Sequence, residues 1–137
     1  MPKQLVKIAG RPVIEHTIRV FEAAPEIDEI IVLMAAGFTG DIDRMVVAGG
    51  YRKVTQVLEG GASRSQTTWR AINAVIDDCN LLFHDAVRPF LDQRIISECI
   101  SALETYDAVD VAIASADTIV TVDDHLGSVI KDVPRRD

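Results

Sequence analysis

A carboxylate and a guanidinium lie three residues apart in the run His84-Asp85-Ala86-Val87-Arg88-Pro89, directly after the apolar segment 81–83. This order is typical of a buried strand that ends at the ligand-binding edge of an α/β sheet. The proline disfavours helical geometry at Arg88, so its guanidinium can reach a phosphate and donate two hydrogen bonds to it. Because successive strand residues point oppositely, we expect Asp85 rather than His84 to face the ligand. The alternative is a salt-bridged strand end with a hydrogen-bonded core histidine.

A second candidate segment, 59–64, joins a double glycine to the start of a helix. Gly60 and Gly61 would let a ligand approach the backbone closely. Ser63 and Gln66 have the capping-box spacing, and the free N–H groups of a helix start favour a phosphate or a polar base edge. The same pattern also fits a plain strand-to-helix turn without a ligand.

The elements that must position these segments alternate between helix and strand. Helical periodicity and capping residues predict four helices, at 13–24, at 40–48, from Ser63 onward with Trp69 and Ile72 on its apolar face, and after Asp92. Short apolar or alternating runs predict strands at 29–34, 53–58, 81–83 and 109–114, followed by a hairpin of 118–122 and 128–130.

This alternation predicts an α/β fold with a Rossmann-like, mostly parallel sheet, helices on both faces and a projecting β-hairpin arm. Ligands of such folds bind beyond the carboxyl ends of the strands, so we expect the loops 35–40, 59–64, 84–89 and 115–118 to converge. No strand precedes Pro2-Lys3-Gln4, so the sheet is expected to lack its first element.

The length and net charge of the chain limit the classes of function it can have. With 137 residues and 48% apolar residues, the chain is expected to form a single domain over 1–137. A net charge of -7 argues against nucleic acid and anionic membranes as partners. If the substrate is anionic, individual Lys or Arg side chains placed at the site must bind it.

The chain lacks both a membrane-span pattern and a secretion-signal pattern, so it is expected to be soluble and cytoplasmic. Cys79 and Cys99 are expected to be reduced structural thiols.

Several motifs occur in an order and spacing that resemble one enzyme family: Pro2-Lys3-Gln4, Glu15-His16-Thr17, Gly60-Gly61-x-x-Arg64, the run 84–89, and Asp117-Thr118. The chain resembles the cytidylyltransferases that act on 2-C-methyl-D-erythritol 4-phosphate, and their relatives that act on D-ribitol 5-phosphate. Segments 107–110 and 116–120 look closer to the ribitol branch. The resemblance implies a nucleotide-diphospho-sugar transferase fold. It also implies a reaction of CTP with a sugar-alcohol phosphate, with Mg²⁺ or another divalent cation and release of pyrophosphate.

The resemblance also implies roles for individual residues. Lys3 matches the catalytic lysine that neutralises charge on the α-phosphate during in-line attack, in keeping with the stabilisation of phosphoryl transfer by fixed positive charge. The positions that match nucleotide contacts are Gly60, Gly61, Arg64, Thr67, Asp85 and Ala86, and Asp85 is also the candidate metal ligand. The positions that match acceptor contacts are Arg88, Thr118, Arg135 and Arg136, some of them supplied across a homodimer by the arm 117–133.

The chain departs from the family pattern at both ends. Family members carry a strand and a glycine-rich loop with an arginine before Pro-Lys-Gln, and a Thr-Pro-Gln stretch and a later lysine after the position of Arg136. We therefore expect the chain to be truncated at both ends. Two other hypotheses stay open: a catalytically impaired relative that acts as a nucleotide-binding or dimerisation module, and a nucleotidyltransferase for another nucleotide or sugar phosphate.

Overall fold

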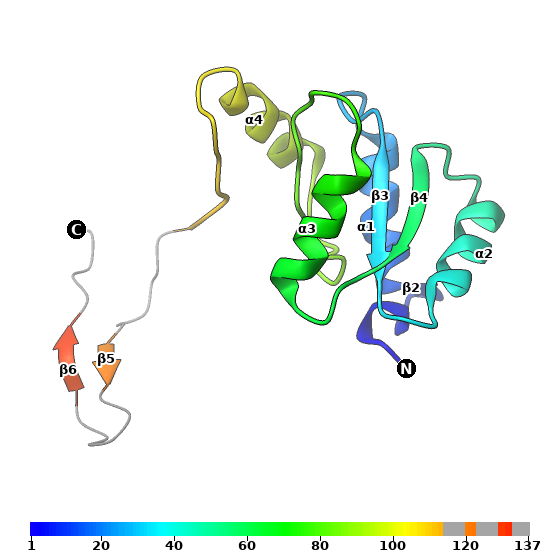
Figure 1. Ribbon diagram of the computed structural model, residues 1–137, viewed down its shortest axis with the longest axis horizontal. Coiled ribbons are helices and arrows are strands. Elements are labelled where there is room, and N and C mark those ends of the chain that lie inside the picture. The colour runs from blue at the N-terminus through cyan, green and yellow to red at the C-terminus, as the bar shows by residue number, and fades with distance from the viewer. Residues whose placement is uncertain (114–119, 123–128, 133–137) are drawn as a thin grey trace. The chain divides into compact units, whose positions relative to one another are not determined.

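The computed structural model describes residues 1–113, 120–122 and 129–132. The chain divides into two compact units, Met1–Asp107 and Ala108–Asp137. The elements of the first unit are η1 (Lys3–Leu5), β1 (Lys7–Ile8), β2 (Arg11–Pro12), α1 (Val13–Ala23), β3 (Ile30–Met34), α2 (Thr39–Gly49), β4 (Val54–Glu59), α3 (Arg64–Ala74) and α4 (Gln93–Leu103) (Figure 1). The second unit contains β5 (Val120–Val122) and β6 (Val129–Asp132).

The main sheet of the first unit is the parallel pair β3–β4, with α2 as the connection between its strands. Ile31 lies opposite Gln56, and Met34, the last residue of β3, lies opposite Glu59, the last residue of β4. Because parallel strands end on the same side, the loops that follow them begin next to each other. The Gly60 N–H extends this pairing by donating to the Met34 carbonyl at 2.8 Å.

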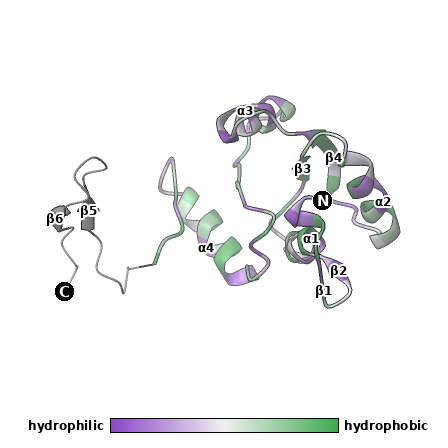
Figure 2. Cartoon of the chain, turned by 90° about the horizontal axis from the view of Figure 1, so that it is seen from below, coloured by the Kyte–Doolittle hydropathy of each residue, from purple (hydrophilic) through white to green (hydrophobic). Residues whose placement is uncertain are grey.

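The hydrophobic core lies between α1, α2 and one face of β3. The buried residues on α1 are four apart, those on β3 are two apart, and α2 contributes one more. They are Ile14, Ile18, Val32, Met34 and Ile42. The two ribbon views show α1 and α3 on opposite sides of the strands (Figures 1 and 2). Helices therefore cover both faces, as predicted, but α3 contributes no buried residue and its Trp69 is 66% exposed.

The predicted helix caps are confirmed. Ser63 Oγ accepts from the Gln66 N–H at 3.2 Å and Asp92 Oδ1 accepts from the Ile95 N–H at 3.0 Å, so each cap satisfies a backbone donor left free at a helix start. The return bond of the capping box is displaced by one residue. Gln66 Oε1 accepts from the Ala62 N–H at 2.9 Å rather than from Ser63, which ties the helix start to the glycine turn before it.

Two strand predictions are wrong within the described residues. Neither 81–83 nor 109–113 has strand hydrogen bonding, and β3 pairs with β4 alone. A strand needs a neighbour that offers a row of backbone donors and acceptors, and apolar composition alone does not supply one. Most side chains of these runs are accordingly exposed, with Phe83 57% and Ile113 94% exposed.

A small hairpin that no sequence pattern predicted lies near the start of the chain. Strands β1 and β2 pair antiparallel across a two-residue turn in which Ala9 has φ 49° and Gly10 has φ 82°. Positive φ at both positions is the geometry that fits the twist of a tight hairpin. The pair Ala-Gly is a weaker signal for this turn than Asn-Gly, and two-residue strands have no periodicity to detect.

In the second unit, β5 pairs antiparallel with β6 at the positions where a hairpin was expected. The remaining residues of the predicted arm 117–133 lie outside the described part of the chain. Its role in dimerisation stays a prediction. Among the described residues, no helix has the length and apolar character required to cross a membrane.

Tyr51 gives the first unit a testable pH dependence. Burial, and then the hydrogen bond that its hydroxyl donates to Glu15 Oε1 at 2.8 Å, raise the pKa of Tyr51 from 10.0 to about 12. Because the folded pKa lies above the unfolded one, the stabilisation is complete below pH 10 and is lost as the pH rises toward 12. We expect the free energy of unfolding to fall more steeply above pH 10 in the wild type than in Tyr51→Phe. Urea denaturation from pH 8 to 11 checks this, and parallel profiles would contradict it.

Candidate functional site

Three of the loops expected at the ligand edge do converge. The loop after β3 contacts the end of β4, because the Gly37 N–H donates to Glu59 Oε1 at 3.3 Å. The loop after β4 reaches the segment 84–89 through an ion pair between Arg64 and Asp85. The N-terminal segment with η1 also lies at this end of β3 and β4 (Figure 1). The fourth loop, 115–118, lies outside the described residues.

The glycine turn is built by contacts with the first turns of α3. The Gly61 N–H donates to Thr67 Oγ1 at 3.0 Å, and the Thr67 hydroxyl donates to the Ser63 carbonyl at 3.0 Å. A Cβ added to Gly61 would lie 2.3 Å from Gln66 Cβ, so only glycine fits this turn. Gly60 and Thr67 also approach closely, since a Cβ on Gly60 would lie 3.2 Å from Thr67 Oγ1.

Arg70 is a site residue that the sequence analysis missed. Its Nη1 donates to the carbonyls of Glu59 and Gly60, at 2.9 Å each, and thereby fixes the turn from the side of α3. An arginine at this helix position is indistinguishable from an ordinary surface cation in the sequence. Its partners are carbonyls, which carry no pattern of their own.

A cluster of three charged side chains joins the glycine turn to the segment 84–89. Asp85 Oδ1 lies 2.9 Å from Arg64 Nη2, and Asp85 Oδ2 lies 3.2 Å from Arg88 Nε. Arg64 and Arg88 are 84% and 75% exposed, while Asp85 is 32% exposed. The cluster carries a net positive charge, and both of its guanidinium groups are largely exposed to solvent. Because exposed ion pairs are weak, an anionic ligand can compete with Asp85 for either arginine.

His84 and Asp85 both contact Arg88, His84 through the Arg88 carbonyl and Asp85 through the guanidinium, so which of the two faces a ligand stays a prediction. His84 Nε2 lies 3.0 Å from the Arg88 carbonyl, and the imidazole packs edge-on against Phe21 with ring centroids 5.4 Å apart. The carboxylate of Asp85 forms ion pairs with Arg64 and Arg88. The contacts of the alternative interpretation, a salt-bridged segment with a hydrogen-bonded histidine, are therefore present.

Of the remaining predicted site residues, Lys3 and Ala86 belong to the described part of the chain. Lys3 is exposed on η1, and within the described part of the chain no hydrogen bond or ion pair joins it to Arg64, Asp85 or Arg88. Ala86 is partly buried, and its carbonyl accepts a hydrogen bond from Thr17. The acceptor-side residues Thr118, Arg135 and Arg136 lie outside the described residues.

Asp85 does not form a cation site by itself. Both of its oxygens face guanidinium groups, and the described residues contain no group of three His, Cys, Asp or Glu side chains that could hold a metal ion. Mg²⁺ prefers several oxygen ligands and is commonly held by one or two carboxylates together with substrate phosphates. The residues as arranged therefore do not fit a resident cation, and the metal role of Asp85 stays a prediction.

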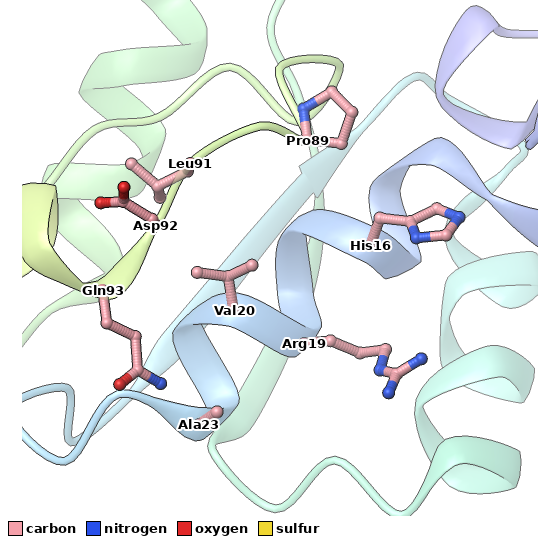
Figure 3. Close-up of a pocket in the computed structure, with 8 residues that line it drawn as sticks. All are labelled: His16, Arg19, Val20, Ala23, Pro89, Leu91, Asp92 and Gln93. Atoms are coloured by element: carbon pink, nitrogen blue, oxygen red, sulfur yellow. The ribbon is translucent and has the colours of Figure 1, made fainter.

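A cavity of about 440 Å³ lies between α1 and the segment that leads into α4, and Pro89 at the end of the segment 84–89 lines it (Figure 3). It is lined by residues of mixed polarity: His16, Arg19, Val20, Ala23, Pro89, Leu91, Asp92 and Gln93. Asp92 is already engaged as the cap of α4. None of the predicted nucleotide or acceptor residues lines this cavity, so it is a second candidate region for a ligand.

The glycine turn generates a prediction for stability. We expect Gly61→Ala to lower the free energy of unfolding by about 1–3 kcal/mol, because the new methyl group overlaps Gln66. Gly40→Ala is the matched control. Its Cβ would lie 3.6 Å from Arg44 Nη1, an ordinary contact, and alanine is favoured over glycine within a helix. Urea denaturation of both variants tests this, and a Gly61→Ala protein as stable as the wild type would contradict it.

Comparison with known proteins identifies relatives along the whole chain. A sequence model of the family "IspD: 2-C-methyl-D-erythritol 4-phosphate cytidylyltransferase" matches residues 1–137. The chain is 44% identical to a bifunctional ribulose 5-phosphate reductase/CDP-ribitol pyrophosphorylase of Haemophilus influenzae, over 98% of this chain and 29% of that protein. It is 41% identical to a 2-C-methyl-D-erythritol 4-phosphate cytidylyltransferase of Thermobifida fusca, over 98% of this chain and 56% of that protein.

Solved structures agree. A 4-diphosphocytidyl-2C-methyl-D-erythritol synthase from Anaerococcus prevotii superposes with a TM-score of 0.86 at 28% identity, over 96% of this chain and 59% of that one. A second 4-diphosphocytidyl-2C-methyl-D-erythritol synthase gives a TM-score of 0.79 at 25% identity, over 98% of this chain and 64% of that one. The chain thus spans less than two thirds of the length of each of these relatives, and it belongs to the 2-C-methyl-D-erythritol 4-phosphate cytidylyltransferase family.

Proposed function

We propose that this protein transfers CMP from CTP to the phosphate of a small sugar alcohol and releases pyrophosphate. The observation that carries the proposal is the cluster Arg64–Asp85–Arg88 beside the glycine turn, at the carboxyl ends of β3 and β4. This edge combines backbone groups that a base can approach with guanidinium donors that suit phosphate. Family membership supplies the reaction class, and the arrangement of side chains suits its two anionic substrates.

The proposed reaction is an in-line displacement at phosphorus. An oxygen of the acceptor phosphate attacks the α-phosphorus of CTP, the new P–O bond forms, and the bond to the β-phosphate oxygen breaks to release pyrophosphate. Lys3 would neutralise the charge that builds on the α-phosphate, since catalysis of this step depends chiefly on positioning and fixed positive charge. CTP would enter as its magnesium complex, with the cation carried by the triphosphate oxygens rather than by a preformed protein site.

The substrate contacts divide between the two loops. The glycine turn with Thr67 would hold the cytosine, and Asp85 with the backbone of Ala86 would hold the ribose. Arg64 borders both groups because it begins α3 and also contacts Asp85. Arg88 would bind the acceptor phosphate. Its other proposed ligands are Thr118, Arg135 and Arg136, contributed across a homodimer by the arm 117–133.

The names of two relatives suggest two acceptors. One relative is a CDP-ribitol pyrophosphorylase, and the other is a 2-C-methyl-D-erythritol 4-phosphate cytidylyltransferase. Both acceptors are short polyols with one terminal phosphate, so exposed arginines would bind either. We propose D-ribitol 5-phosphate as the preferred acceptor because segments 107–110 and 116–120 look closer to the ribitol branch.

Lys3→Ala tests the proposed catalytic role. We expect pyrophosphate release to fall by about 100-fold or more while the Kd for CTP changes little, because the fixed charge acts mainly in the transition state. Lys7→Ala is the matched control, since Lys7 is another exposed lysine near the start of the chain. A coupled pyrophosphate assay and calorimetric titration with Mg-CTP provide the two readouts.

Unchanged turnover in Lys3→Ala would remove that residue from catalysis. A wild-type protein that binds Mg-CTP but releases no pyrophosphate with either acceptor would instead support a nucleotide-binding module.

Substrate competition tests the specificity. We expect CTP to be used at least 10-fold better than UTP or GTP, because a base held by fixed backbone groups loses hydrogen bonds when its edge changes. Rates with D-ribitol 5-phosphate are expected to exceed those with 2-C-methyl-D-erythritol 4-phosphate. Equal use of the three nucleotides would contradict the proposed cytosine contact at the glycine turn.

A further inference from the structure

Three consecutive side chains near the start of α1 contact three different parts of the first unit. Glu15 Oε1 accepts from the Tyr51 hydroxyl at 2.8 Å, and His16 Nε2 lies 2.9 Å from the Ile8 carbonyl. The Thr17 hydroxyl donates to the Ala86 carbonyl at 2.9 Å. The proposed reaction assigns no role to the motif Glu15-His16-Thr17, although it is one of those that carry the family resemblance.

Thr17 has the most informative of these contacts. It is 5% exposed, and it is the only buried polar or charged residue in the described part of the chain. A threonine within a helix commonly bonds the carbonyl one turn earlier on its own helix. Thr17 instead donates to a carbonyl 69 residues away, in the middle of the charged segment 84–89. Loss of the hydroxyl would leave that carbonyl without its side-chain donor.

A second contact from the same helix face supports this attachment. Phe21 lies one turn after Thr17, and residues four apart on a helix lie on the same side. Phe21 packs against the His84 ring, whose Nε2 lies 3.0 Å from the Arg88 carbonyl. The Arg88 N–H in turn donates to the Asp85 carbonyl at 2.9 Å. The segment is therefore closed by its own hydrogen bonds and attached to α1 at two points.

Helix α1 is itself held firmly, because Ile14 and Ile18 belong to the buried core. A hydrogen bond from this helix therefore fixes the position and orientation of the segment 84–89 relative to the core. The same segment presents Asp85 to Arg64 across the gap between the two loops. Its position therefore determines whether Asp85 and the two guanidinium groups remain within reach of one another.

We propose that Thr17 is a positioning residue for the candidate site. Its hydroxyl holds the Asp85–Arg88 turn against α1, so that Asp85 and Arg88 keep their places beside the glycine turn. The identity of the ligand rests on the function proposed above, whereas the attachment of the turn does not. Thr17 does not touch the substrate in this account and acts through the Ala86 carbonyl.

The test compares Thr17→Val, which keeps the shape but lacks the hydroxyl, with Thr17→Ser, which keeps the hydroxyl. Hydrogen exchange of the Arg88 amide reports on the turn, and titration with Mg-CTP reports on the site. We expect Thr17→Val to speed exchange at Arg88 by about tenfold beyond any change in global unfolding, and to weaken CTP binding by about tenfold. Thr17→Ser is expected to restore both.

Two control variants separate positioning from general destabilisation. Ile18→Val removes a methyl group from the core on the same helix and is expected to lower stability without a specific effect at Arg88. Thr55→Val changes an exposed threonine on β4 and is expected to behave like the wild type.

Normal exchange at Arg88 in Thr17→Val, or an increase no larger than that in Ile18→Val, would overturn the proposal. Faster exchange with unchanged CTP affinity would overturn the link to the site. If the wild type does not bind CTP, the proposed function fails, while the exchange data still decide the attachment.

Discussion

The parallel pairing of β3 with β4 is the constraint on which the candidate site depends. It places Met34 and Glu59 side by side, so the two loops that follow start at one edge. Hydrogen bonds from Gly60 and Gly37 then fix those loops to the strand ends. Without that register, the glycine turn and Arg64 would have no fixed relation to the rest of the first unit.

Electrostatics gives this edge its chemical character. The chain is acidic overall, with a formal charge of -7, yet two arginines share a single carboxylate at the site. Asp85 pairs with both guanidinium groups, and their exposure lets a phosphate reach them. In the proposed function, a divalent cation carried by the triphosphate and the two arginines would both neutralise charge on the substrates. The chain itself supplies only the second among its described residues.

The sequence predicted best where a local pattern determines a local structure. The helices at 13–24 and after Asp92 and the caps at Ser63 and Asp92 follow from side-chain spacing and backbone donors, which act within one turn of helix. Prediction failed where a partner decides the outcome. The run 81–83 has strand composition, but in the described chain no strand pairs with it. Arg70 and Thr17 were missed as structural contacts because their partners are distant carbonyls.

Amide chemical-shift mapping during titration with Mg-CTP tests the central claim, which is where the nucleotide binds. The account predicts that the largest changes occur at Gly60, Gly61, Thr67 and the segment 85–88. Changes confined to the cavity between α1 and the start of α4, at residues such as Val20 and Gln93, would contradict it. The absence of any change at saturating nucleotide would contradict it as well.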